Sequence, residues 1–133
     1  VDAWTATAVA TDNCDGATVV VPTYVAPVDN CNQTVTVDFT SIDACGNTTV
    51  ETKAFIVNDV TGPVVTVPAA DLTMECFDAA LVDAWTATAS ATDNCDPAVT
   101  VVPTYTFPTT NCQSVTVTFT ATDACGNVTM ETK

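Results

Sequence analysis

The chain repeats itself, and this repeat constrains its fold more than any other feature of the sequence. The segment VDAWTATAVATDNCDGA at Val1 recurs as VDAWTATASATDNCDPA at Val82, and VTVDFTSIDACGNTTVETK at Val35 recurs as VTVTFTATDACGNVTMETK at Val115. The offset falls from 81 to 80 residues after Cys31, because the next residue has no counterpart in the second copy. Copies this similar are typical of tandem arrays that reuse one structural unit. We therefore expect two units that are built alike, with a period of about 80 residues.

The copies are out of frame with the ends of the chain. Residues 54–81 have no partner in the first copy, so the sequence predicts an incomplete first repeat with its linker at residues 1–60 and a second repeat at residues 61–133. We expect the first repeat to lack its first strand and the second to be truncated in its last strand. On this interpretation the sequence is a slice of a longer array.

Alternating side chains predict an all-β fold. Apolar side chains alternate with threonine from Val115 to Thr122, and alanine alternates with threonine or serine after Trp85 as far as Thr92. No segment shows a convincing helical period. Further strands are expected at residues 64–67, 72–76, 99–102 and 128–133, the last continuing through Val57 in the first copy. About six or seven short strands in one repeat fit a β-sandwich.

Seven cysteines and no histidine indicate disulfide bonds rather than a metal site. Zinc sites usually use close C-x-x-C pairs or histidine, and neither is present. Cytosolic thiols stay reduced, so this many cysteines favour an oxidising, extracellular location. Four cysteines in one repeat allow three different pairings. The second copy has Cys76, Cys95, Cys112 and Cys125, and the first has Cys14, Cys31 and Cys45.

The charge of the chain excludes several classes of partner. Sixteen acidic residues and two lysines give a net charge of −14, whereas nucleic acids and anionic membrane surfaces are bound by basic patches. No apolar run approaches the roughly 18 residues that a membrane helix needs, so we expect no membrane-embedded segment. No histidine, activated nucleophile or phosphate-binding loop is present, so we expect no enzymatic activity.

Several motifs resemble a known family. ATDNC at Ala91, VTVTFTATDACGN ending at Asn127 and the linker VNDVTGP at Val57 resemble HYR-type Ig-like repeats. The cysteine-containing form is similar to the repeats of very large Bacteroidota surface proteins, including the SprB-type gliding adhesins. The resemblance covers essentially the whole chain and implies tandem Ig-like β-sandwiches at the cell surface. The chain departs from many members in the last strand, where Val50 and Met130 replace a cysteine.

An Ig-like topology also implies which cysteines pair. The loop after the second strand and the hairpin before the last strand meet at one tip of such a fold, and the other cysteines of the repeat lie near the opposite end. Each bridge would stabilise the fold by about 2–4 kcal/mol. The implied pairs are Cys95–Cys125, Cys76–Cys112 and Cys14–Cys45, with Cys31 left unpaired.

The same topology gathers acidic side chains at that tip, where the linker from the preceding domain also arrives. Clustered carboxylate and amide oxygens are the ligands that Ca²⁺ prefers, which makes calcium the candidate cofactor. The alternative is that these residues only form turns. The candidate ligands are Asn58, Asp59, Asp93, Asn94, Asp96 and Asp123.

These features favour a structural role. The leading hypothesis is a disulfide-stapled repeat of a large secreted surface adhesin that forms an extended stalk or filament for attachment or gliding. Its partners would be neighbouring repeats, and surface glycans or proteins through other regions. Two alternatives remain: a carbohydrate- or protein-binding Ig-like accessory module of a secreted multidomain protein, and a self-assembling filament subunit that takes a strand from a neighbour.

Overall fold

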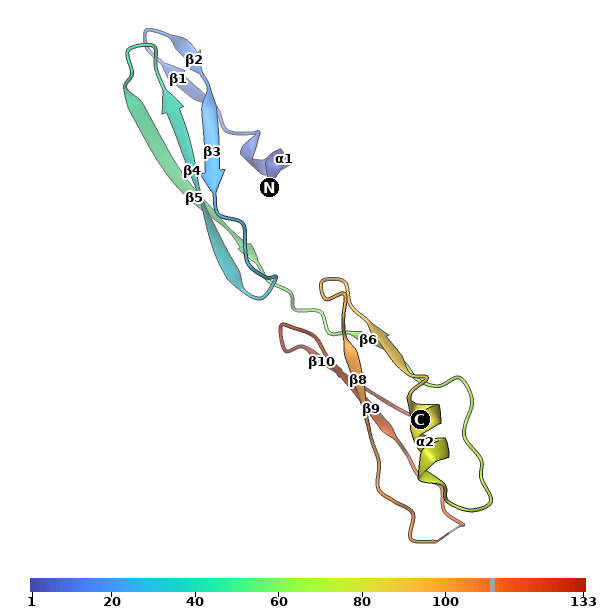
Figure 1. Ribbon diagram of the computed structural model, residues 1–133. Helices are drawn as coiled ribbons and strands as arrows, with labels where there is room; N and C mark the ends of the chain where they lie inside the picture. The colour runs from blue at the N-terminus through green and yellow to red at the C-terminus, as the bar shows by residue number, and fades with distance from the viewer. Residues whose placement is uncertain (111) are drawn as a thin grey trace. The chain divides into compact units, whose positions relative to one another are not determined.

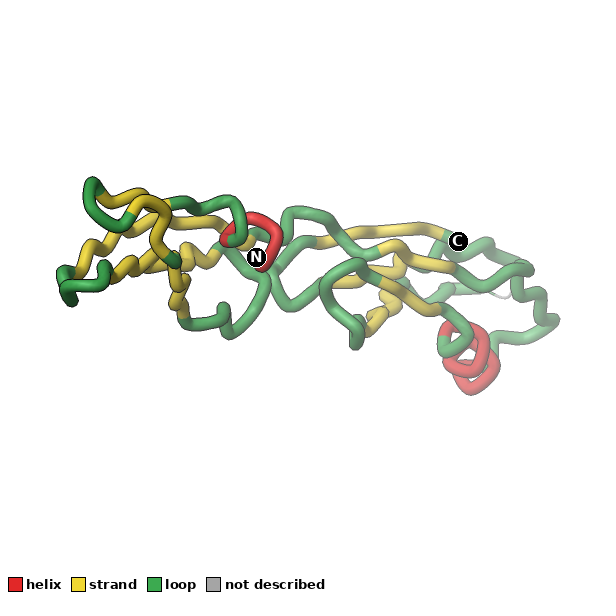
Figure 2. The backbone as a smooth tube through the Cα atoms, turned by 90° about the horizontal axis from the view of Figure 1, so that it is seen from above, coloured by secondary structure: helices red, strands yellow, loops and turns green. Residues whose placement is uncertain are grey.

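The fold is known from a computed structural model, which describes residues 1–110 and 112–133. The chain divides into two compact units, unit 1 (Val1–Asn58) and unit 2 (Asp59–Lys133), and this boundary lies close to the expected one. Strands and loops make up most of each unit, and the two helices in the described residues are short (Figures 1 and 2). The expectation of a mostly β chain is therefore confirmed. Neither of these helices is long and apolar enough to cross a membrane.

Unit 1 contains two antiparallel sheets and a one-turn helix. One sheet is the β1–β2 hairpin, and the other places β4 between β3 and β5 (Figure 1). Val35 and Val37 on β4 are buried and form the centre of this unit. Its elements are α1 (Asp2–Thr5), β1 (Ala10–Asp12), β2 (Gly16–Thr18), β3 (Val20–Tyr24), β4 (Gln33–Ile42) and β5 (Thr48–Val57).

Unit 2 has the same three-stranded sheet and a different two-stranded one. Here β9 lies between β8 and β10, and β6 pairs with β7. Val117, Phe119 and Ala121 are buried, and Pro63 from the segment before β6 joins this core. Its elements are β6 (Val64–Thr66), α2 (Ala79–Thr86), β7 (Ser90–Thr92), β8 (Thr100–Thr104), β9 (Thr118–Thr122) and β10 (Val128–Thr132).

Equivalent residues of the two copies occupy the same register. Pro22 is paired with Phe39 in unit 1, and the equivalent Pro103 is paired with Phe119 in unit 2. The pairings of β4 with β5 and of β9 with β10 agree in the same way. The internal repeat of the sequence is therefore also a repeat of the three-stranded sheet. A two-sheet Ig-like sandwich remains an expectation.

The alternation that predicted a strand near Val115 is confirmed over most of its length. Val117, Phe119 and Ala121 face the core, and Thr122 is exposed. Val115 is 36 % exposed and precedes the start of β9. The strands expected at residues 64–67, 99–102 and 128–133 correspond to β6, β8 and β10, and β5 extends to Val57 as expected.

The strand expected from Trp85 to Thr92 is wrong, because its first part is the end of α2. Asp78 caps this helix, and its carboxylate accepts a hydrogen bond from the Ala80 amide at 2.9 Å. Val82, Trp85 and Thr86 are the least exposed residues of α2, and this i, i+3, i+4 spacing is helical. The alternating alanines and threonines hid that period.

Two further local differences have structural causes. The strand expected at residues 72–76 is absent, and the segment is irregular. Unit 2 also lacks a counterpart of β2, because Gly16 has a positive φ of 72° where the second copy has Pro97. Proline holds φ near −65° and cannot adopt that conformation.

Candidate functional site

Asp93 begins the acidic tip of unit 2 with an Asx turn. It directly follows β7, and its Oδ1 accepts hydrogen bonds from the amides of Cys95 at 2.8 Å and Asp96 at 3.0 Å. Aspartate favours such turns because its side chain can bond the backbone two residues further on. The second oxygen, Oδ2, is buried and has no hydrogen-bond partner among residues 1–110 and 112–133.

Asp59 brings the linker to the same tip. Asp59 is only 8 % exposed, and its Oδ1 accepts from the Thr61 amide at 3.1 Å. Its Oδ2 is buried and has no nitrogen donor among the described residues, but the Cys95 thiol is hydrogen-bonded to this carboxylate. Its backbone carbonyl accepts from Asn127 Nδ2 at 3.2 Å, which ties the linker to the turn between β9 and β10. The linker thus belongs to the packed body of unit 2.

The other two aspartates of the tip have hydrogen bonds to both carboxylate oxygens. Asp96 accepts from the amides of Ala98 and Ala124, both at 3.0 Å. Asp123 accepts from Asn127, through the amide at 2.8 Å and through Nδ2 at 2.8 Å. Burial raises the pKa of Asp123, but these hydrogen bonds outweigh it and hold the pKa below its ordinary value. These two residues build turns, as the alternative to calcium binding anticipated.

A thiol completes the cluster. Asp59, Asp93 and Cys95 each offer one ligand atom, and these atoms lie within 4.8 Å of one another. Desolvation, followed by the charges of Asp59 and Asp93, raises the pKa of Cys95, so the thiol stays protonated at neutral pH. Asn94 Nδ2 lies 3.0 Å from the sulfur. Of the six expected ligands, the structure thus gathers Asp59 and Asp93 beside the Cys95 thiol, while Asn58 ends unit 1.

Unit 1 has an equivalent tip with a different environment. Asp12, Asp15 and Asp43 place carboxylate oxygens within 4.8 Å of one another. Asp12 Oδ1 accepts from the Cys14 amide at 2.8 Å, and Asp15 Oδ2 accepts from the Ala44 amide at 2.7 Å. Hydrogen bonds from the Asn47 side chain and amide hold the pKa of Asp43 below its ordinary value. Among the described residues of unit 1, no buried carboxylate oxygen lacks a partner.

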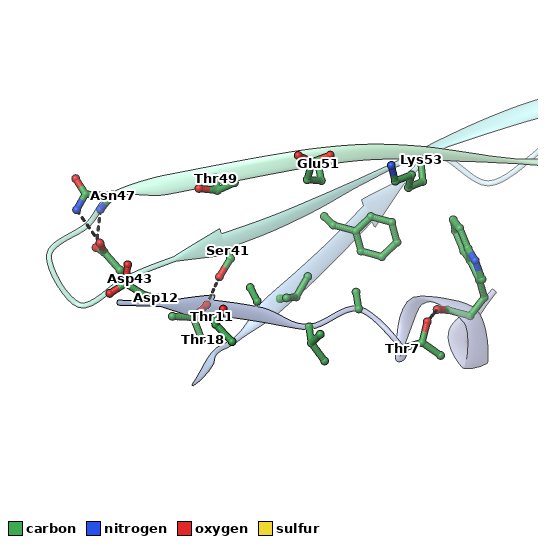
Figure 3. A pocket seen from close by; sticks show the side chains of 16 residues that line it. Thr7, Thr11, Asp12, Thr18, Ser41, Asp43, Asn47, Thr49, Glu51 and Lys53 are labelled. Carbon is green, nitrogen blue, oxygen red and sulfur yellow. Dashed lines mark hydrogen bonds between the residues drawn. The ribbon is translucent and has the colours of Figure 1, made fainter. Parts of the chain in front are cut away.

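A groove of about 480 Å³ opens beside this tip in unit 1. Figure 3 shows Thr49, Glu51 and Lys53 of β5 along one side of the groove, and Thr11 and Asp12 of β1 across from them. Its lining also includes Trp4, Phe39 and Ser41, whose equivalents belong to the core of unit 2 or lie beside it.

The segment Asp59–Thr66 covers the equivalent surface in unit 2. There β6 pairs with β7, in the register Val65 opposite Ala91, and contacts β9 and β10. A methyl group on Gly62 would lie 2.8 Å from Thr129 Oγ1, which shows how closely the linker backbone lies against β10. Phe119 is fully buried as a result, whereas the equivalent Phe39 is only half-buried.

The cysteines differ from the expected arrangement. Cys31 was expected to be unpaired, but Cys31 and Cys125 are both disulfide-bonded in the structure. The three implied bridges are not formed, and the other five cysteines carry thiols on exposed residues: Cys14, Cys45, Cys76, Cys95 and Cys112. The pairing in the mature protein therefore stays a prediction for peptide mapping.

Sequence reasoning missed two features of these sites. It did not anticipate that the Cys95 side chain lies within 4.8 Å of the Asp59 and Asp93 carboxylates. It also did not anticipate that Gly62 packs against β10 and that Pro63 is buried in the core of unit 2. Comparison with known proteins found no matching family model, no matching curated protein and no matching solved structure.

Proposed function

We propose that the chain is a structural repeat of a large extracellular surface adhesin, in which many such units are joined into a stalk or filament. The observation that carries this proposal is the integration of the linker into the following unit. β5 ends at Val57 and unit 2 begins at Asp59, so a single residue separates the two. A connection this short leaves few free backbone dihedrals, which suits an array whose units act as spacers.

The conserved register of the two copies supports the same role. Two units with the same three-stranded sheet give a repeatable element whose number sets the length of the array. The excess of acidic side chains keeps such a surface soluble. On this proposal no residue is catalytic, and purified protein should not hydrolyse glycans, peptides or esters.

Small-angle X-ray scattering of chains with two, four and six repeats tests the stalk. We expect the maximum dimension to rise by an equal increment for each added repeat, because each linker is held by the next unit. A maximum dimension that grows as the square root of repeat number would identify flexible linkers and contradict the proposal. Surface proteolysis of intact producing cells tests the location, since a stalk repeat must be released without lysis.

A self-assembling subunit is the second candidate, because unit 1 has a groove that an extended segment could fill. The residues that line this groove are equivalent to the residues that β6 covers in unit 2. We therefore expect the groove to bind an extended segment like Asp59–Pro68 from another repeat. A synthetic peptide of this sequence should bind the full chain and reduce the exposure of Trp4. A peptide with Pro63 replaced by aspartate is the control, because Pro63 fills the core of unit 2. Equal binding of both peptides would contradict strand addition.

The accessory-module alternative has less support. Trp4 is 41 % exposed and lines the groove, as a sugar-stacking residue would. However, its ring packs edge-on against Phe39 with centroids 5.6 Å apart, and Trp85 packs against Phe119 in the same way at 5.9 Å. The shared contact identifies both tryptophans as packing residues, with Trp4 exposed because its groove is open.

A further inference from the structure

Unit 2 contains a cavity that is separate from the acidic tip. It lies between residues 71–77, which lead into α2, and residues 105–110 and 113–115, which follow β8 (Figure 1). Its volume is about 360 Å³, within the roughly 300–1,000 Å³ of pockets that bind small ligands. None of the described residues that line it belongs to the acidic tip. The cavity is therefore a second candidate site in this unit.

Aromatic and apolar side chains form much of the cavity wall. Phe77, Trp85 and Tyr105 each contribute a ring to the lining. Trp85 is held by two contacts, because its ring packs edge-on against Phe119 with centroids 5.9 Å apart and its Nε1 donates to the Ala70 carbonyl at 2.8 Å. A ligand would thus meet a wall that is already ordered, which lowers the entropic cost of binding.

Polar groups line the same cavity, and their charges cancel. Among the described residues of the lining, only Asp71 and Lys133 are charged, and they form an ion pair at 3.0 Å. Gln113 and Thr110 add an amide and a hydroxyl group. Residues 97–122 contain no charged side chain, although the chain has 16 acidic residues. The lining therefore suits an uncharged ligand with an apolar face and a hydrogen-bonding edge.

The two copies of the repeat differ beside this cavity. Phe107 occupies the place of Ala26 in the first copy. Its ring packs edge-on against both Phe77 and Tyr105, with centroids 5.5 Å and 5.3 Å away. Phe107 thus joins the two sides of the cavity, and Ala26 has no ring that could do the same. The aromatic cluster is a feature of the second copy that the shared sheet does not require.

We propose that this cavity of unit 2 binds an uncharged sugar. A sugar ring presents C–H groups on its face and hydroxyl groups at its edge, which matches aromatic rings beside the Asp71–Lys133 pair and Gln113. A purely apolar ligand would leave these polar groups without partners, and a charged ligand would have to separate the ion pair. The site does not rest on the proposed stalk function, since it needs only the fold of unit 2.

Calorimetric titration of the full chain with cellobiose, maltose and N,N′-diacetylchitobiose tests the proposal. We expect one of these neutral disaccharides to bind at a single site. Affinity should fall by about tenfold in Tyr105→Ala and in Phe107→Ala, as expected for the loss of one aromatic contact. Phe107→Ala should fold, because the first copy has alanine there. Val115→Phe places a larger side chain in the cavity at a residue that is already 36 % exposed, and it should abolish binding.

Unit 1 provides the matched control, because Tyr24 occupies the place of Tyr105. Tyr24→Ala should leave the affinity unchanged, and the thermal unfolding of each variant shows that it is folded. The proposal is overturned if none of the disaccharides binds, if Tyr24→Ala weakens binding as much as Tyr105→Ala, or if Val115→Phe binds like the unchanged chain. Tighter binding of toluene or of glucuronate than of every neutral sugar would overturn the ligand class.

Discussion

Units 1 and 2 have nearly the same sequence over their shared region, yet only unit 2 has a closed core. Phe119 is completely buried, while the equivalent Phe39 borders an open groove. The residues on β4 and β9 do not explain this, because their pairings with neighbouring strands have the same register. The difference lies in the segment Asp59–Thr66, which packs on unit 2, whereas no described residue packs on unit 1 in the same way.

This difference shows what the linker contributes to one repeat. It supplies a strand through β6, a fully buried proline, and a buried aspartate at the acidic tip. The equivalents of the residues it covers, such as Thr49 for Thr129, are exposed in unit 1. Experiments that change equivalent residues in both units therefore measure the contribution of the linker directly.

The largest expected effect comes from removing the buried phenylalanine. Phe119→Ala should destabilise unit 2 by about 3–5 kcal/mol, because it leaves a cavity in a closed core. Phe39→Ala should cost unit 1 clearly less, since Phe39 is already half-exposed. Urea denaturation followed by tryptophan fluorescence separates the units when either Trp4 or Trp85 is replaced by phenylalanine. Equal losses in the two units would show that the linker adds nothing to the core.

A smaller effect is expected from Gly62→Ala. The added methyl group would meet Thr129 Oγ1 at 2.8 Å, so unit 2 should lose about 1–3 kcal/mol through overpacking. The double variant Gly62→Ala, Thr129→Ala should recover most of this loss, because the next contact, with the Val128 carbonyl, is 3.5 Å away. Thr49→Ala is the matched control in unit 1 and should be nearly neutral. Failure of the double variant to recover would place the strain elsewhere.

A still smaller loss of stability is expected when the asparagine in the tip turn of each unit is replaced by alanine. Asn127 Nδ2 donates to Asp123 Oδ2 and to the Asp59 carbonyl, whereas among the described residues Asn47 Nδ2 donates to Asp43 Oδ2 alone. Asn127→Ala should therefore cost about 1 kcal/mol more than Asn47→Ala, the net value of one hydrogen bond. Thermal denaturation of each variant measures this difference. A larger cost in unit 1 would contradict the linker contact.

The smallest expected effect is a pH dependence shared by both units. The pKa values of Asp43 and Asp123 are lowered below 3.8 in the folded state. Their contribution to stability is thus complete above the unfolded pKa and is lost as the pH falls through the folded pKa. We expect urea midpoints to fall between about pH 5 and pH 2. Asn47→Ala should flatten this fall in unit 1, and an unchanged slope would show that the asparagine does not set the pKa.

The sequence predicted the sheets well because their signal is local. Alternation along Val117–Ala121 and the internal repeat were enough to place β9, β10 and their counterparts. The sequence-based prediction was wrong at α2. There the alternation of alanine and threonine concealed the helical spacing of Val82 and Thr86 and the cap at Asp78. A capped, alanine-rich segment can override a two-residue pattern, because alanine favours a helix more than a strand.

The acidic tip was only partly predictable. The convergence of Asp59 with Asp93 followed from the expected topology, but which carboxylates are used in turns depends on individual hydrogen bonds that no pattern encodes. The buried Oδ2 atoms of Asp59 and Asp93 have no sequence signature of their own.

The packing of Pro63 into unit 2 also has a mechanical consequence. Tension carried along the backbone from Val57 reaches unit 2 at Asp59, so it acts first on the segment held by Pro63 and by the β6–β7 pairing. That segment is short, and we expect it to detach at a lower force than the β8–β9–β10 sheet. Each unit would thus lengthen under strong pulling by releasing its linker, and it would regain its length when the proline returns to the core.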